Sequence, residues 1–200
     1  MKTLFRRYSF LSLITMAVNV MRTKLFFKNA RIIRFPIDIR GKRFIKVDKG
    51  FTTGRNCRLE AYPANNETVL IFGKNFQMND FVHITAMKGV SFGDNVLLAS
   101  KVYISDCTHG SYSGDQYDSS PIVPPIDRKM SSKSVIIDDN VWIGESVSIL
   151  PGVKIGKGSI IGANSVVTKD IPENVIAVGI PAVPIKKYNF TSGSWEKLNK

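Results

Sequence analysis

Two histidines and two cysteines are the side chains of this 200-residue chain best suited to proton transfer or nucleophilic attack near neutral pH. An imidazole can remove the proton of a weakly acidic hydroxyl while that oxygen attacks an electrophile. Cys107 lies two residues before His109, so a cysteine nucleophile is an alternative, although this offset in a loop need not align the two side chains. There is no Cys-x-x-Cys pair, and two histidines cannot supply a three-histidine zinc site, so we expect no metal.

A six-residue repeat must position these side chains. One file of aliphatic residues recurs without a slip at Ile137, Ile143, Ile149, Ile155, Ile161 and Val167. The same spacing is found earlier in the chain, at Phe72, Met78 and Ile84 and again at Phe92, Leu98 and Ile104. A period of six suits neither a helix nor a simple strand, but it suits short strands that close triangular coils, with the aliphatic residue pointing inward. The expected fold is all-β, a left-handed parallel β-helix, which is an exception to the right-handed crossover rule.

The phase of the repeat predicts where the chain leaves the prism. Ile104 and Ile137 are separated by far more than one hexad, so residues 106–133 are expected to form one long excursion loop. This loop contains His109 and several Gly and Pro residues, and loops of that length in compact domains are usually functional. A smaller excess lies between Ile84 and Phe92. We expect a basic N-terminal arm or cap at 1–45, the β-helix at 46–185 and a C-terminal tail at 186–200.

Most of the positive charge lies in the expected arm. Residues 1–49 contribute +11 of the net +12, so the body is nearly neutral and a nucleic-acid partner is not expected. The apolar run Phe10–Val20 is too short to span a bilayer, and no small-x-small cleavage site follows it. Two interpretations stay open for the arm: a basic amphipathic helix that contacts an anionic membrane or a partner, and a solvated helix that caps the domain.

Three segments carry a resemblance to a known family: Gly93–Gly110, Asp138–Gly156 and Ile160–Ala182. They resemble the hexapeptide-repeat O-acetyltransferases, above all the bacterial lipopolysaccharide (O-antigen) enzymes, over about Ile32–Tyr188. The resemblance implies a homotrimer with active sites in the clefts between neighbouring prisms. It also implies acetyl-CoA as co-substrate, a saccharide acceptor and a role in surface polysaccharide biosynthesis.

The resemblance further implies roles for individual residues. His109 matches the catalytic base of a direct transfer, and Glu145 matches the position whose backbone N–H stabilises the oxyanion. The CoA-contacting positions fall on Ala163, Thr168, Lys169 and Lys186, and Trp142 belongs either to the CoA slot or to packing at the trimer interface.

Asn79 matches an acceptor-contacting asparagine of the galactoside enzymes. An acceptor-contacting aspartate of those enzymes has no counterpart in Ile84–Met87, which argues against galactoside-like recognition. His83 follows an inward position and should point outward, either as a surface residue or as part of the acceptor site.

Other functions are less consistent with the residues. A γ-type carbonic anhydrase needs three histidine ligands for its zinc, and this chain has only two histidines. A β-helical ice-binding scaffold would need flat arrays of threonine, which are absent. One alternative stays open for the reaction: N-acetyl transfer to an amino sugar, either free or nucleotide-linked. The form of the acceptor also stays open between a nucleotide sugar, a lipid-linked oligosaccharide and a polymer. Cysteine usage favours a reducing compartment, so we expect a cytoplasmic protein that the arm can bring to the inner membrane.

Overall fold

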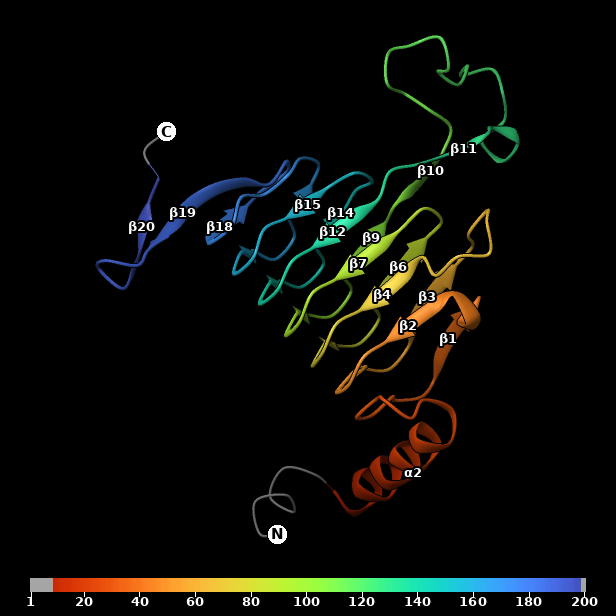
Figure 1. The fold of residues 1–200 in the computed structure, drawn as a ribbon, viewed down its shortest axis with the longest axis vertical. Helices are drawn as coiled ribbons and strands as arrows, with labels where there is room; N and C mark the ends of the chain where they lie inside the picture. The colour runs from red at the N-terminus through yellow and green to blue at the C-terminus, as the bar shows by residue number, and fades with distance from the viewer. Residues whose placement is uncertain (1–8, 199–200) are drawn as a thin grey trace.

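The computed structural model describes residues 9–198, so residues 1–8 and 199–200, the ends of the expected arm and tail, lie outside the description. The chain winds into a triangular prism with a β-sheet on each of its three faces (Figure 1). Face A contains β5 (Gln77–Met78), β8 (Leu97–Leu98), β13 (Trp142–Ile143), β16 (Ile160–Ile161), β18 (Val175–Val178), β19 (Val183–Asn189) and β20 (Ser194–Lys197). Face B contains β1 (Ile37–Arg40), β3 (Cys57–Ala61), β6 (His83–Ala86), β9 (Tyr103–Ser105), β14 (Ser148–Ile149) and β17 (Val166–Val167). Face C contains β2 (Ile45–Val47), β4 (Leu70–Phe72), β7 (Val90–Phe92), β12 (Val135–Ile137) and β15 (Lys154–Ile155).

The inward side chains stack in the files that the hexads predict. On face C, Phe72 pairs with Phe92, and Ile137 pairs with both Phe92 and Ile155. The Phe72 and Phe92 rings are stacked with their centroids 5.1 Å apart, and none of these four side chains is more than 3% exposed. Full burial of such a side chain stabilises a fold by about 1.5–3 kcal/mol. The prediction of a parallel β-helix with hexad positions in its core is therefore confirmed.

The chain turns at three corners, which we name by the faces they join in chain order: A–B, B–C and C–A. At the C–A corner, Asn75, Asn95, Asn140 and Asn174 have φ between 56° and 58°. Asparagine tolerates this left-handed conformation better than most residues, because its short polar side chain can form local hydrogen bonds. The recurring asparagines of the sequence therefore mark turns.

Two segments leave the prism at the B–C corner. The longer one, between β9 and β12, is the expected excursion loop; it begins and ends in an antiparallel ribbon of β10 (Cys107–His109) and β11 (Met130–Ser132) and contains the 3-10 helix η2 (Pro125–Asp127). The shorter one, residues 62–69 between β3 and β4, was not expected from the hexad count. Both leave the same edge of the prism.

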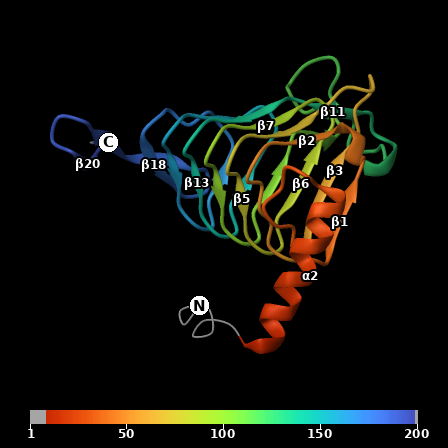
Figure 2. The same cartoon turned by 60° about the horizontal axis from the view of Figure 1, so that its bottom comes forward.

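The two ends of the prism carry different structures (Figures 1 and 2). Helix α2 (Phe10–Phe26) lies at the N-terminal end, where the Ser9 hydroxyl caps it by accepting from the Ser12 N–H. Strand β1 already pairs with β3, so the prism begins within residues 1–45, and the 3-10 helix η1 (Lys42–Phe44) leads into β2. At the other end β19 and β20 form an antiparallel hairpin. Within residues 9–198, no helix is long and apolar enough to cross a membrane.

Candidate active site

His109 lies at the end of β10, where the excursion loop leaves the B–C corner. Its backbone pairs with Met130 of β11, and its side chain is exposed to solvent. The ribbon therefore holds the imidazole outside the core, where it can reach a ligand that lies along this corner of the prism.

The base of the loop is anchored by Asp106. This side chain is completely buried, and its carboxylate accepts hydrogen bonds from the backbone N–H groups of Met87 (2.9 and 3.0 Å), Lys88 (2.8 Å) and Gly89 (2.6 Å). Its carbonyl accepts from the Lys133 N–H at 2.8 Å, which joins the two ends of the loop. Asp106 therefore fastens the loop to the β6–β7 turn, where the hexad phase showed its smaller excess, and none of these bonds involves an imidazole.

A second set of bonds fixes the backbone of His109 itself. The Tyr112 hydroxyl donates to the His109 carbonyl at 2.6 Å, and Arg128 Nη1 donates to that hydroxyl at 2.7 Å. Gly110 has φ of 112°, and a Cβ at this position would lie 2.6 Å from the Tyr112 hydroxyl. Glycine after His109 therefore lets the tyrosine close over the chain. The sequence motifs did not point to Tyr112 or Arg128, because they meet only when the loop folds back.

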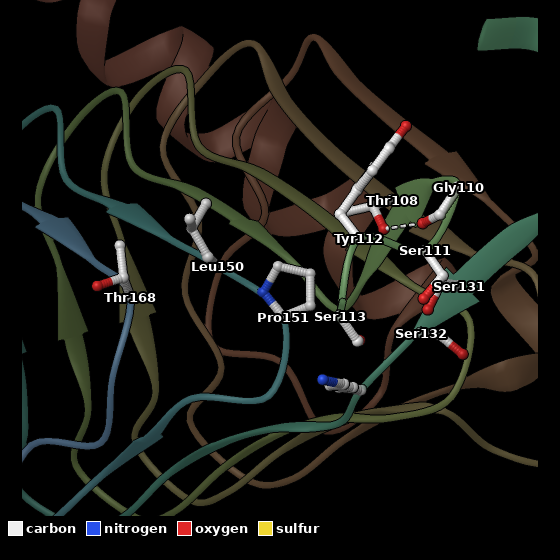
Figure 3. Close-up of a pocket in the computed structure, with 11 residues that line it drawn as sticks. Thr108, Gly110, Ser111, Tyr112, Ser113, Ser131, Ser132, Leu150, Pro151 and Thr168 are labelled. Carbon is white, nitrogen blue, oxygen red and sulfur yellow. Dashed lines mark hydrogen bonds between the residues drawn. The ribbon is translucent and has the colours of Figure 1, made fainter. Parts of the chain in front are cut away.

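A pocket of about 230 Å³ opens beside this loop base (Figure 3). It is lined by Thr108 and Gly110, which flank His109, and by Leu150, Pro151 and Thr168 from the next two coils. Ser111, Ser131 and Ser132 add hydroxyl groups to its wall. The pocket thus connects the surroundings of the candidate base with Thr168, a predicted CoA contact.

Other predicted site residues lie along the A–B corner. Asn79, Glu145 and Ala163 follow β5, β13 and β16, and all three are exposed. Among residues 9–198, the Glu145 N–H donates to no protein group, which is what an oxyanion donor requires. Trp142 lies just before this corner on the outer side of β13 and is 49% exposed.

The C-terminal coils carry the predicted basic contacts. Thr168 and Lys169 follow β17 at the B–C corner and are exposed, whereas Lys186 lies in β19 and pairs with Ile176 of β18. The predicted CoA and catalytic residues are therefore divided between two edges of the prism. Face B separates these edges, so a single chain does not bring His109 together with Asn79, Glu145 or Ala163.

His83 belongs to a polar network on the outer side of face B. Its Nε2 lies 2.8 Å from Oε2 of Glu60, a side chain that is only 5% exposed. The same carboxylate also binds Arg40, Arg58, Tyr62 and Thr85. Burial raises the pKa of Glu60, but the hydrogen bonds from His83, Tyr62, Arg58 and Thr85 outweigh it and lower the pKa to about 2. Sequence reasoning missed Glu60, because its partners come from three strands about a coil apart.

Cys107 is poorly suited to nucleophilic chemistry. Burial raises the pKa of its thiol, with a further contribution from the neighbouring Asp106 carboxylate. A thiol with a raised pKa holds little of the reactive thiolate near neutral pH. This argues against a cysteine nucleophile and leaves the exposed His109 as the candidate catalytic residue of the pair.

The prism of hexapeptide coils and the exposed histidine at its corner fit the acyltransferase class that the sequence resembles, and comparison with known proteins identifies the same class. Residues 134–169 match the family model described as bacterial transferase hexapeptide (six repeats). WbbJ of Escherichia coli K12, by name a lipopolysaccharide biosynthesis O-acetyl transferase, is 44% identical over 194 residues, which is 97% of each chain. The galactoside O-acetyltransferase of the same organism is 35% identical over 156 residues, covering 77% of this chain and 72% of that one.

Solved structures agree with this assignment. A galactoside acetyltransferase in complex with coenzyme A superposes with a TM-score of 0.53 at 34% identity, covering 75% of this chain and 74% of that one. The N-acyltransferase AntD from Bacillus cereus shares the fold, with a TM-score of 0.68 at 20% identity over 86% of this chain and 90% of that one. The chain belongs to the hexapeptide-repeat acetyltransferases, whose prism is the left-handed β-helix.

Proposed function

We propose that this protein transfers the acetyl group of acetyl-CoA to a hydroxyl of a saccharide during the biosynthesis of a surface polysaccharide of the O-antigen type. Similarity to WbbJ along almost the whole chain supports the choice of acceptor class. The observation that carries the chemistry is the exposed imidazole of His109 on an anchored loop base, beside a pocket that reaches Thr168.

The proposed reaction needs no covalent enzyme intermediate. His109 removes the proton of the acceptor hydroxyl as its oxygen bonds to the acetyl carbon. The negative charge that develops on the carbonyl oxygen is stabilised by the Glu145 backbone N–H. The carbon–sulfur bond then breaks, and the imidazolium returns the proton to the CoA thiolate. Holding donor and acceptor together supplies a large part of the rate enhancement.

The expected consequence in the cell is specific. Deleting the gene should remove an acetyl increment from the surface polysaccharide, and the wild-type gene should restore it, as measured by mass spectrometry of the isolated polymer. Mild base, which cleaves esters but not amides, should remove the same increment from the wild-type polymer. An increment that survives mild base would indicate N-acetyl transfer instead.

The division of the site between two edges supports the proposal of a homotrimer. His109 at the B–C corner of one prism can meet Asn79, Glu145 and Ala163 only at the A–B corner of another. Three copies close a ring in which every such cleft is equivalent.

The membrane contact of residues 1–45 is the second part of the proposal, and helix α2 supports it.

Helix α2 presents its apolar side to solvent and its polar side to the prism. Asn19 and Thr23 are buried, and the Thr23 hydroxyl accepts from the Ile33 N–H at 2.8 Å. The exposed stripe, with spacings of three and four residues, consists of Leu11, Ile14, Val18, Met21 and Leu25. Arg22 and Lys24 flank it on the helix surface. An apolar stripe with basic borders is suited to the headgroup region of an anionic leaflet, such as the cytoplasmic face of the inner membrane.

Two serine substitutions in the stripe should separate membrane binding from folding. Leu11→Ser with Ile14→Ser should weaken binding to vesicles that contain anionic lipid by more than about tenfold, because each side chain contributes about 1.5–3 kcal/mol when buried. Co-sedimentation measures this. The matched control, Ile122→Ser with Ile126→Ser, removes two exposed isoleucines from the excursion loop and should leave vesicle binding unchanged. Equal binding by both double variants would argue for a helix that only caps the prism.

A further inference from the structure

The A–B corner has a second pocket at the N-terminal end of the prism. It measures about 460 Å³ and is lined in part by Arg31, Arg34, Asn79, Asp80 and Ser100. Asn79 is the predicted acceptor contact, so the pocket adjoins the place where a sugar is expected. It is separate from the pocket beside His109, which lies at the B–C corner.

Its two arginines are not paired with a carboxylate in the part of the chain that the structure describes. Among residues 9–198, no carboxylate oxygen lies within 4.0 Å of either guanidinium. Arg34 Nη1 donates to the Thr53 carbonyl at 2.8 Å, and Arg31 Nη2 reaches Asn75 Oδ1 only at 3.5 Å. A guanidinium has five N–H donors, so most donors of Arg31 and Arg34 meet no protein acceptor within residues 9–198. The Asp80 carboxylate, which also lines the pocket, accepts from the backbone N–H of Arg55 at 2.6 Å.

The pocket lies between helix α2 and the proposed reaction centre. The segment that carries both arginines is bound to the polar side of α2, where the Ile33 N–H donates to Thr23 and the Phe35 N–H lies 3.4 Å from Asn19 Oδ1. In the other direction, the Ser146 N–H donates to the Ser100 carbonyl at 3.0 Å, which links the pocket to the turn that contains Glu145. A ligand in this pocket would therefore lie between the turn that contains Glu145, the proposed oxyanion donor, and helix α2, for which membrane contact is proposed.

We propose that Arg31 and Arg34 bind the phosphate or pyrophosphate group of the acceptor, and that the sugar to be acetylated lies beside Asn79. This inference rests on the proposed acetyl transfer and names the chemical class of its acceptor, a glycosyl phosphate or pyrophosphate. Guanidinium groups suit this task because their fork geometry matches phosphate oxygens. The phosphates of CoA are less suited to this pocket, because the pocket lies in the N-terminal coils. The predicted CoA contacts Ala163, Thr168 and Lys186 lie in the C-terminal coils. The group attached to the phosphate can be a nucleoside or a lipid.

Binding measurements can test this without turnover. Titration calorimetry with inorganic pyrophosphate should show binding to the full-length protein, and Arg31→Gln or Arg34→Gln should each weaken it about tenfold, as expected for the loss of a hydrogen bond to a charged group. Arg55→Gln is the matched control, since it removes the same charge from outside the pocket lining and should have little effect. Uridine diphosphate and farnesyl pyrophosphate are titrated in the same way. Tighter binding of uridine diphosphate than of pyrophosphate would identify a nucleotide-linked acceptor, and tighter binding of farnesyl pyrophosphate would identify a lipid-linked one.

Acetyl-CoA affinity separates this inference from the proposed function. It should be unchanged in Arg31→Gln and Arg34→Gln. If it falls in parallel with pyrophosphate affinity, the pocket serves the donor, and the inference is wrong while acetyl transfer stands. If none of the three phosphate probes binds the wild-type protein, the inference is likewise overturned. Failure of the proposed acetyl transfer would be seen instead as an unchanged acetyl content of the polysaccharide after gene deletion. That result does not depend on these binding measurements.

Discussion

Replacing His109 with alanine is expected to lower kcat for acetyl transfer by about 10²–10⁴-fold, the usual cost of removing a general base. Acetyl-CoA binding and assembly should be retained, because the His109 side chain is exposed and forms no side-chain hydrogen bond within residues 9–198. Any dependence of kcat on pH that comes from the general base should be absent from the variant. Initial rates with a fixed acceptor, measured across pH, provide the comparison.

Two variants make the His109 experiment selective. His83→Ala removes the other histidine and should be much milder, because the Glu60 carboxylate keeps its bonds to Arg40, Arg58, Tyr62 and Thr85. Tyr112→Phe leaves the imidazole in place and removes only the hydroxyl that holds the His109 carbonyl, so it should lower kcat by less than His109→Ala and keep the pH dependence. If His109→Ala retained more than about a tenth of wild-type kcat, or if His83→Ala were the more damaging change, the base would be wrongly assigned.

Mixing two inactive variants should restore activity, which is the second large effect. Glu145→Pro removes the backbone N–H proposed to stabilise the oxyanion. Ser146 has φ of 57°, a positive value of the kind found at the third residue of a type II turn. Residue 145 is then the second residue of that turn, a position at which proline is common. The protein should therefore fold and assemble, yet transfer acetyl groups poorly, since loss of one oxyanion donor costs about 10²–10³-fold in kcat.

The restored activity has a predicted size. If each site takes His109 from one chain and Glu145 from its neighbour, about a quarter of the sites in randomly mixed trimers of His109→Ala and Glu145→Pro chains are intact. The variants are refolded or co-expressed together, and the mixture is compared with each variant alone. Activity near that of the single variants would mean that each chain carries its own complete site. Refolding each variant separately before mixing is the control, since preformed trimers should not recover.

Much of the fold could be predicted because the six-residue repeat shows directly which side chains are buried in the core. Every coil must bury one aliphatic side chain per face, so Ile143, Ile149 and Ile155 recur at intervals of six, and a break in the phase marks a departing loop. The shorter excursion at residues 62–69 was not predicted, because the first coils follow the hexad only weakly. The helical segment near the N-terminus was also expected, but the side of α2 that faces the prism was not.

By itself, the sequence determined the prism, the loop and the family, and through the family resemblance it pointed to His109, Asn79, Glu145 and the CoA contacts. These depend on local periodicity and on motifs that are continuous in the chain. Only the tertiary structure decided that His109 and Glu145 lie on different edges, that Asp106 anchors the loop to the 87–89 turn, and that Glu60 gathers partners from three strands. It also placed Arg31 and Arg34 beside Asn79. These relations join residues one or more coils apart, and the hexad constrains only which residues point inward, not which polar groups meet on the outer surface.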